Sequence, residues 1–247
     1  ISPGEILCLV GESGSGKSLS AGAIMRLLPE PHVRVTHGSI RLEGTELYSL
    51  TEGAMKKLRG DRIGMIFQEP MTALNPQKTV GWQIDEVLRL HTKLSRKERR
   101  VAVLDMLGEV KIPDPMSAYS AYPHQISGGQ RQRVMIAMAL ILKPRLIIAD
   151  EPTTALDVTT QAQILKLIRD LQREHNTGIL FITHDFGVVA EIADRVAVLR
   201  LGQLVEEGPA QEVLNNPQHP YTQALIASVP ALTPPEVKQS VNSQPVI

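Results

Sequence analysis

Gly11-Glu12-Ser13-Gly14-Ser15-Gly16-Lys17-Ser18 matches the phosphate-binding pattern G-x-x-x-x-G-K-[ST]. The motif needs a strand before it and a helix after it. An apolar run over residues 6–10 precedes it, and apolar residues at helical spacing continue from Leu19 until Pro29 ends them. Glycines let backbone N–H groups face an anion, the helix N-terminus adds about half a positive charge, Lys17 adds a full charge, and the Ser18 hydroxyl can bind Mg²⁺. We therefore predict a phosphate site over residues 11–19, Leu19 included, rather than a glycine turn with a surface lysine.

The composition narrows the range of partners. The 247 residues contain 26 Lys and Arg against 26 Asp and Glu, so no net positive field exists to hold nucleic acid. The only cysteine, Cys8, lies in an apolar run, where we predict a buried thiol and a reducing compartment. The longest apolar run, residues 134–142, has nine residues where a spanning helix needs about twenty. Because the first residue is Ile and no signal peptide is present, we expect the sequence to begin inside a longer polypeptide.

The order of the predicted elements indicates an α/β core that is interrupted by helices. Strands are predicted at 6–10, 38–44, 63–67, 146–149, 179–182, 196–199 and 202–208, and helices at 51–58, 80–91, 130–142, 157–174 and 187–192. A capping box at residues 95–98 opens a further helix, with Val101, Leu104 and Leu107 as its apolar stripe. Strands separated by helices pair in parallel through right-handed crossovers. We assign residues 1–78 and 144–215 to the core, 79–143 to a helical insertion, and 216–247 to a C-terminal extension and tail.

Two carboxylates follow a predicted buried strand at residues 146–149. The carboxyl ends of parallel strands meet at one edge of the sheet, so Asp150 and Glu151 can face the phosphate loop. Asp150 is suited to hold Mg²⁺, and Glu151 is suited to accept a proton from an attacking water. The alternative is that both are ordinary acidic turn residues. Next to a phosphate loop we favour the functional interpretation.

Two further polar residues end predicted core strands. His184 follows the strand at 179–182, where it can bond a terminal phosphate or position a water, although a lone histidine is more often structural. Gln68 follows the strand at 63–67 and can bond water or a metal without charge. Both residues are candidates for the same site.

Ser127-Gly128-Gly129-Gln130 forms a second candidate anion site. A hydroxyl and two glycines open a helix whose next turn carries Arg131 and Arg133. The chain thus has two phosphate-binding segments but one pair of candidate catalytic carboxylates. We therefore expect two molecules to enclose two nucleotides, each site being completed by the partner molecule. An ordinary N-capped helix after a proline-rich loop is the alternative.

These motifs together resemble the nucleotide-binding domains of ABC transporters. The matching residues stand in the family's order: the glycine loop, Gln68, Ile126-Ser127-Gly128-Gly129-Gln130, Asp150-Glu151, Ala155-Leu156-Asp157 and His184. The resemblance implies a P-loop NTPase fold of the RecA-like type, with a mainly parallel sheet, a small antiparallel β region and an inserted helical subdomain. It also implies ATP and Mg²⁺ as ligands.

The resemblance assigns a role to each matching residue. Lys17 would bind the phosphates, Ser18, Asp150 and Gln68 would hold Mg²⁺, Glu151 would be the general base and His184 the switch. Ser127 and Gly129 would reach the partner's terminal phosphate, and Asp157 would lie at the dimer interface. The aromatic residue that stacks on adenine in this family would precede Ile1.

Two stretches resemble the dipeptide and oligopeptide importer ATPases in particular, a group that includes nickel and glutathione importers. They are residues 67–76, Phe-Gln-Glu-Pro-Met-Thr-Ala-Leu-Asn-Pro, and residues 219–225, His-Pro-Tyr-Thr-Gln-Ala-Leu. The resemblance implies a peripheral subunit at the cytoplasmic face of a membrane, bound to permease subunits and served by an external solute-binding protein. The solute itself cannot be read from this chain.

Two other classes remain as alternatives. A soluble ABC ATPase of repair or translation usually carries long coiled coils or strongly basic additions, and neither is present. A small-molecule P-loop kinase would need an arginine-rich lid and offers no reason for residues 127–130. Co-purification with an integral membrane partner would separate the importer from both.

Overall fold

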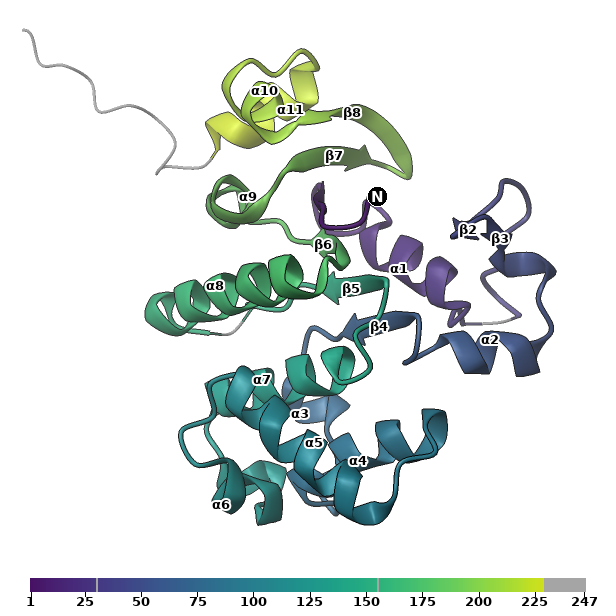
Figure 1. Cartoon of the computed structure of the whole chain (residues 1–247). Coiled ribbons are helices and arrows are strands. Elements are labelled where there is room, and N and C mark those ends of the chain that lie inside the picture. The colour runs from purple at the N-terminus through teal and green to yellow at the C-terminus, as the bar shows by residue number, and fades with distance from the viewer. Residues whose placement is uncertain (30, 155, 229–247) are drawn as a thin grey trace, which may run out of the picture.

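A six-stranded sheet forms the centre of the computed structural model, which describes residues 1–29, 31–154 and 156–228 (Figure 1). The strand order is β4-β5-β6-β1-β7-β8, with β8 antiparallel to β7 and the other neighbours parallel. The strands are β1 (Ile6–Val10), β4 (Ile63–Ile66), β5 (Leu146–Asp150), β6 (Gly178–Ile182), β7 (Arg195–Arg200) and β8 (Gln203–Pro209). The carboxyl ends of β1, β4, β5 and β6 therefore lie along one edge of the sheet.

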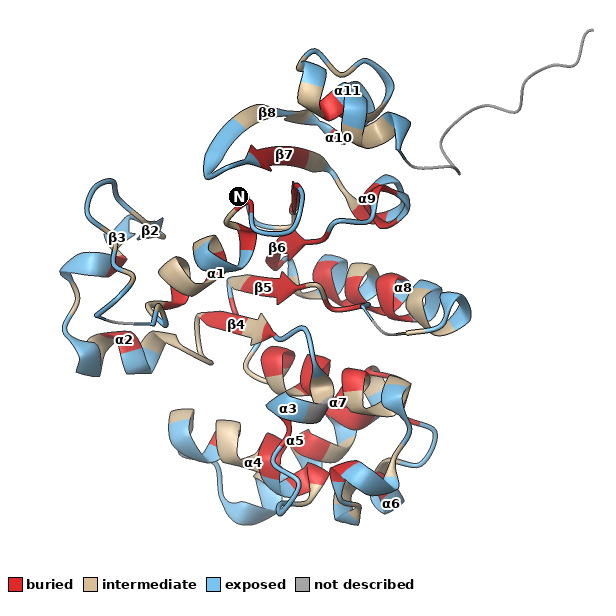
Figure 2. Cartoon of the chain, turned by 180° about the vertical axis from the view of Figure 1, so that it is seen from behind, coloured by how far each residue is buried: buried red, intermediate tan, exposed pale blue. Residues whose placement is uncertain are grey.

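The alternation of side chains along these strands builds two hydrophobic clusters. In β1, Cys8 and Val10 belong to the larger cluster and Leu9 to the smaller one, because successive side chains point to opposite faces. Helices α8 (Val158–His175) and α9 (Phe186–Ile192) contribute to the larger cluster, and α1 (Lys17–Met25) contributes to the smaller one. The sheet is thus covered on both faces, and its parallel strands are largely buried, whereas the edge strand β8 has no buried residue (Figure 2).

Cys8 is fully buried in β1, as predicted, and burial raises the pKa of its thiol. The thiol is therefore protonated and unreactive at neutral pH. Its place in the sheet makes it part of the core.

Residues 79–143 contain helices that pack mainly on one another. They are α4 (Val80–His91), α5 (Arg96–Glu109), α6 (Pro115–Ser120) and α7 (Gly128–Leu140), with a 3₁₀ turn at Pro123–Gln125. The short helix α3 (Pro70–Ala73) packs on α7, which also contacts β4 and α8. The predicted apolar stripe of α5 was wrong at Val101, which is 52% exposed. The buried face is formed instead by Val103, Met106 and Leu107, at helical spacing from one another.

The region between α1 and β4 departs from the predicted elements in two places. The single strand expected at 38–44 is a hairpin of β2 (Arg41–Leu42) and β3 (Thr45–Glu46), because Glu43 and Gly44 both take positive φ angles and turn the chain. Helix α1 ends at Met25 rather than at Pro29. Arg26 there adopts φ 50°, and its guanidinium donates hydrogen bonds to the carbonyl oxygens of Leu47 and Leu50. A 3₁₀ turn (Leu47–Ser49) and helix α2 (Glu52–Leu58) follow.

The described chain ends with α10 (Ala210–Asn215) and α11 (Pro220–Ala227), which follow β8. The extended tail predicted for the last eighteen residues lies outside the described residues. Within the described ranges, no helix is both long enough and apolar enough to span a bilayer.

Candidate functional site

The phosphate loop joins the end of β1 to the start of α1. Gly11 has φ 151°, and a Cβ at this position would collide with the carbonyl oxygen of Leu199. Gly16, with φ 104°, occupies the N-cap of α1 and offers no side chain that could cover the helix N-terminus. Ser15 Oγ is buried without a hydrogen-bond partner among the described residues. The remaining predicted members, Ser13, Gly14, Ser18 and Leu19, are exposed. The loop therefore presents backbone N–H groups and hydroxyls to an anion.

Lys17 is only 6% exposed, and its ammonium group binds the loop itself. Its Nζ donates to the carbonyl oxygens of Gly11 (2.8 Å) and Glu12 (2.9 Å). Burial lowers the pKa of Lys17, and the nearby carboxylates of Glu151 and Asp150 oppose that shift. An ammonium group has three hydrogens, so one remains for a ligand.

Asp150 lies at the end of β5, and the Ser18 hydroxyl donates to its Oδ1 at 3.2 Å. Burial raises the pKa of Asp150, while the bond from Ser18 opposes the rise. A cation would relieve this cost of burial. The pair offers hard oxygen ligands, which are those that Mg²⁺ prefers.

Glu151 joins three other side chains. Gln68 Nε2 donates to its Oε2 (3.0 Å), Thr154 Oγ1 donates to the same oxygen (3.0 Å), and His184 Nδ1 lies 3.1 Å from Oε1. An ionised carboxylate only accepts, so the histidine nitrogen that faces it carries the proton. Glu151 itself has φ 46°, a left-handed conformation that is uncommon outside glycine, and its N–H donates to the Ile182 carbonyl.

Lys17, Gln68, Glu151 and His184 line one cavity of about 420 Å³, whereas Ser18, Asp150 and Thr154 are not part of its lining. Its lining includes residues expected from the sequence and two that were not, Phe186 and Leu225; the full set is Gly11, Glu12, Ser13, Lys17, Gln68, Glu151, His184, Phe186 and Leu225. Thr154, which donates to Glu151, was also not predicted from the sequence. The one signal in the sequence was that Thr154 lies three residues after Glu151. That spacing alone does not single out a threonine as part of a site.

The segment at residues 127–130 does not line this cavity. Ser127 is the N-cap of α7; its Oγ accepts from Gln130 N–H (3.3 Å), and Gln130 Oε1 accepts from Ser127 N–H (2.9 Å). A Cβ on Gly129 would lie 2.9 Å from the methyl group of Thr160, so α7 and α8 approach closely there. At the same helix start Gly128 is exposed and Gln130 is half-buried. The structure thus separates the two predicted anion-binding segments.

Asp157 is the exposed N-cap of α8. Its carboxylate accepts from Thr160 N–H (2.9 Å) and Thr160 Oγ1 (2.7 Å), bonds that lower its pKa. In the predicted turn at 155–157, Ala155 lies outside the described residues.

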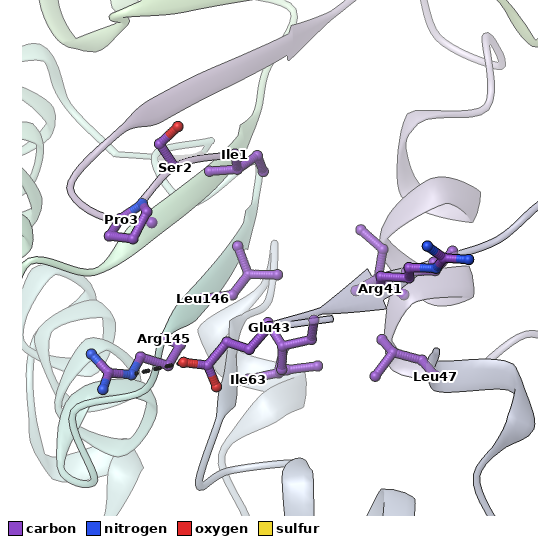
Figure 3. A pocket seen from close by; sticks show the side chains of 13 residues that line it. Ile1, Ser2, Pro3, Arg41, Glu43, Leu47, Ile63, Arg145 and Leu146 are labelled. Carbon is purple, nitrogen blue, oxygen red and sulfur yellow. Dashed lines mark ion pairs between the residues drawn. The ribbon is translucent and has the colours of Figure 1, made fainter. Parts of the chain in front are cut away.

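A second cavity of about 420 Å³ lies between the N-terminal residues, the β2–β3 hairpin and the start of β5 (Figure 3). Its walls are mainly apolar, and Arg145 Nε lies 3.3 Å from Glu43 Oε1 beside them. Among the described residues, none from the phosphate loop lines it. We therefore assign phosphate binding to the cavity that Lys17 and Glu151 line.

Comparison with known proteins places these features in a family. Residues 1–154 match the family model described as ABC transporter, and residues 205–245 match that of the oligopeptide/dipeptide transporter C-terminal region. The chain is 55% identical over 229 residues to the oligopeptide transport ATP-binding protein OppD of Bacillus subtilis, covering 93% of this chain and 64% of OppD. It is 55% identical over 234 residues to the glutathione import ATP-binding protein GsiA of Escherichia coli, covering 93% of this chain and 38% of GsiA.

Solved structures agree with this placement. The dimeric structure of a post-hydrolysis state of the ATP-binding cassette MJ0796, bound to ADP and Pi, matches with a TM-score of 0.74 and 32% identity, covering 85% of this chain and 87% of that one. The predicted α/β P-loop fold is confirmed. This chain belongs to the ABC transporter family of ATP-binding proteins.

Proposed function

We propose that this chain binds and hydrolyses ATP and that the hydrolysis powers the import of peptides through a membrane permease. The observation that carries the proposal is the meeting of Lys17, Asp150, Gln68, Glu151 and His184 at the phosphate loop. In this proposal residues 1–78 and 144–215 form the ATPase core, 79–143 the helical subdomain and 216–247 the C-terminal extension.

The phosphate loop and the polar side chains at its edge each have a task in phosphoryl transfer. The loop N–H groups and Lys17 hold the phosphates and stabilise the charge that develops on them. Glu151 accepts the proton of the attacking water. His184 and Gln68 hold the Glu151 carboxylate in place, and His184 responds to the terminal phosphate.

Ser18, Asp150 and Gln68 would hold Mg²⁺. The hydroxyl and the buried carboxylate are already neighbours, and the amide of Gln68 uses its nitrogen for Glu151, so its oxygen is the atom suited to a cation. When bound, Mg²⁺ neutralises charge on the phosphates. The chain's own contribution is to fix these oxygens beside Lys17.

The site is completed by a second ATPase domain, of the same chain or a similar one. Residues 127–130 stand apart from the cavity of their own chain, with an exposed helix start that can face a partner's ATP. Asp157 lies at that interface. The related cassette MJ0796 is a dimer in its post-hydrolysis state with ADP and Pi, which supports the arrangement.

Peptides are the proposed cargo because OppD is named as an oligopeptide transport protein and the C-terminal region matches that of oligopeptide/dipeptide transporters. GsiA, named as a glutathione importer, is equally similar, so glutathione is the second candidate. The chain would act at the cytoplasmic face of the membrane, bound to permease subunits that receive solute from an external binding protein.

Phosphate release from ATP by the purified chain tests the proposal. We expect release to require Mg²⁺ and to fall at least a hundredfold in Lys17→Ala, since the charge that binds the phosphates is lost. Excess EDTA should abolish release, and added Mg²⁺ should restore it. Equal rates in Lys17→Ala and the unsubstituted chain would contradict the assignment of the site.

The permease contact is expected at residues 72–75, beside Gln68. Thr72 and Ala73 are exposed, whereas Leu74 is buried and Asn75 N–H donates to Gln83 Oε1, so the first two can be changed without disturbing the fold. Thr72→Arg should lower peptide uptake by about tenfold or more in the reconstituted transporter and leave basal ATPase unchanged, because a cation there disrupts a surface contact worth ~1.4 kcal/mol or more.

Thr45→Arg, at an exposed position of the β2–β3 hairpin, is the matched control and should transport normally. Uptake and phosphate release are measured on the same vesicles. Normal uptake with Thr72→Arg would place the permease contact elsewhere.

A further inference from the structure

Helix α11 lies against the phosphate loop. The N–H of Glu12 donates to the hydroxyl of Tyr221, with 3.2 Å between nitrogen and oxygen, although 209 residues separate them. One turn further along α11, Leu225 lines the cavity of Lys17 and Glu151. The helix lies within the segment that matches the oligopeptide/dipeptide transporter C-terminal region.

The position of Tyr221 is fixed from several sides. Its N–H donates to His219 Nδ1 (3.1 Å), which caps the helix, and the ring lies under the Arg200 guanidinium at 4.9 Å. The Glu206 carboxylate accepts from the N–H groups of Gln218 (2.7 Å) and His219 (3.1 Å), which ties the start of α11 to β8. The next residue, Thr222, is fully buried. The Tyr221 hydroxyl is therefore held where Glu12 meets it.

The peptide groups of Glu12 connect Tyr221 to the phosphate-binding lysine. The Glu12 carbonyl accepts from Lys17 Nζ, and the Glu12 N–H donates to Tyr221. On the other side of the loop, Gly202 N–H donates to the Ser15 carbonyl, so the β7–β8 turn holds the second half of the loop as α11 holds the first. Because both halves of the phosphate loop are already held, the loop loses less conformational entropy when a nucleotide binds.

We propose that α11 is a positioning element of the ATP site, in which Tyr221 sets the phosphate loop through Glu12 and Leu225 closes one wall of the cavity. The inference rests on the proposed ATPase function. It gives the C-terminal region a role inside the nucleotide site, in addition to any role toward other subunits. Tyr221 touches no reacting atom, so its effect is on ATP affinity rather than on the chemical step.

Tyr221→Phe in the full 247-residue chain tests this, because it removes the hydroxyl and keeps the ring under Arg200. Losing one neutral hydrogen bond should weaken binding of a fluorescent ATP analogue by about two- to tenfold. The rate at saturating ATP should stay within about twofold, and the amide hydrogen of Glu12 should exchange faster with solvent. The thermal midpoint should change little, since the bond lies at the surface.

Tyr119→Phe is the matched control, because that ring lies 4.8 Å from the Arg100 guanidinium, within residues 79–143 and away from the cavity. It should bind the analogue like the unsubstituted chain. If the unsubstituted chain binds ATP and Tyr221→Phe binds it equally well, the inference is wrong. If both substitutions weaken binding alike, the effect is not specific and the inference is again wrong. If the unsubstituted chain binds no ATP, the proposed function fails first.

Discussion

Glu151→Gln should stop ATP hydrolysis while ATP still binds. The substitution keeps the shape of the side chain, and its amide oxygen can still accept from Gln68 and Thr154 while its amide nitrogen faces His184, but it removes the group that accepts the proton of water. General-base catalysis contributes about 10²- to 10⁴-fold to a rate, so we expect phosphate release to fall by that factor. The Kd for ATP should change by less than about threefold, because the phosphate loop and Lys17 are untouched.

The variant should also accumulate a dimer that contains ATP, since hydrolysis is the step that opens it. Size-exclusion chromatography with Mg²⁺ and ATP measures this dimer directly. Glu191 is an exposed carboxylate on α9 outside the cavity, and Glu191→Gln is the control. It should hydrolyse ATP normally and form the same proportion of dimer as the unsubstituted chain. Normal turnover by Glu151→Gln would remove the glutamate from its proposed role.

The sequence predicted the fold class and the family correctly because both depend on local signals. A strand, a glycine loop and a helix are adjacent in the chain, and the pairing of strands through helices follows from their alternation. The prediction that Gln68, Glu151 and His184 meet also needed no long-range information. Each residue ends a strand, and in a parallel sheet such ends lie along one edge. Their roles in catalysis stay predictions.

Contacts between distant segments could not be predicted in this way. The bond from Glu12 to Tyr221 depends on how the chain returns to the phosphate loop after β8, and no periodicity in the sequence encodes that path. The β2–β3 hairpin was mistaken for a single strand because a turn at Glu43 and Gly44 needs positive φ angles, which glutamate rarely adopts. The stripe of α5 was misread because Val101 is apolar but exposed. Burial there is decided by packing against neighbouring helices.

Whether residues 127–130 act on the ATP of a partner is tested by mixing two inactive variants. Lys17→Ala damages the phosphate loop, and Ser127→Arg places a bulky cation where the partner's phosphates and Mg²⁺ would come. If each ATP lies between the loop of one molecule and Ser127 of the other, a mixed dimer has one intact site and one site with both defects. At equal amounts and random pairing, half of the dimers are mixed, so about a quarter of the unmixed, unsubstituted rate should return if the sites work independently.

Ser127→Arg also removes the N-cap of α7, so loss of stability must be separated from loss of the trans contact. Ser95→Arg is a matched control, because Ser95 is the N-cap of α5 in the same kind of capping box, with Glu98 in place of Gln130. Each substitution should cost about 1 kcal/mol of stability, so thermal midpoints should fall alike. Ser95→Arg should nevertheless keep its ATPase rate, because its helix does not face the nucleotide. If every mixture of Lys17→Ala and Ser127→Arg stays inactive while both chains fold and dimerise, Ser127 does not complete its partner's site, and the separation of residues 127–130 from the cavity would need another explanation.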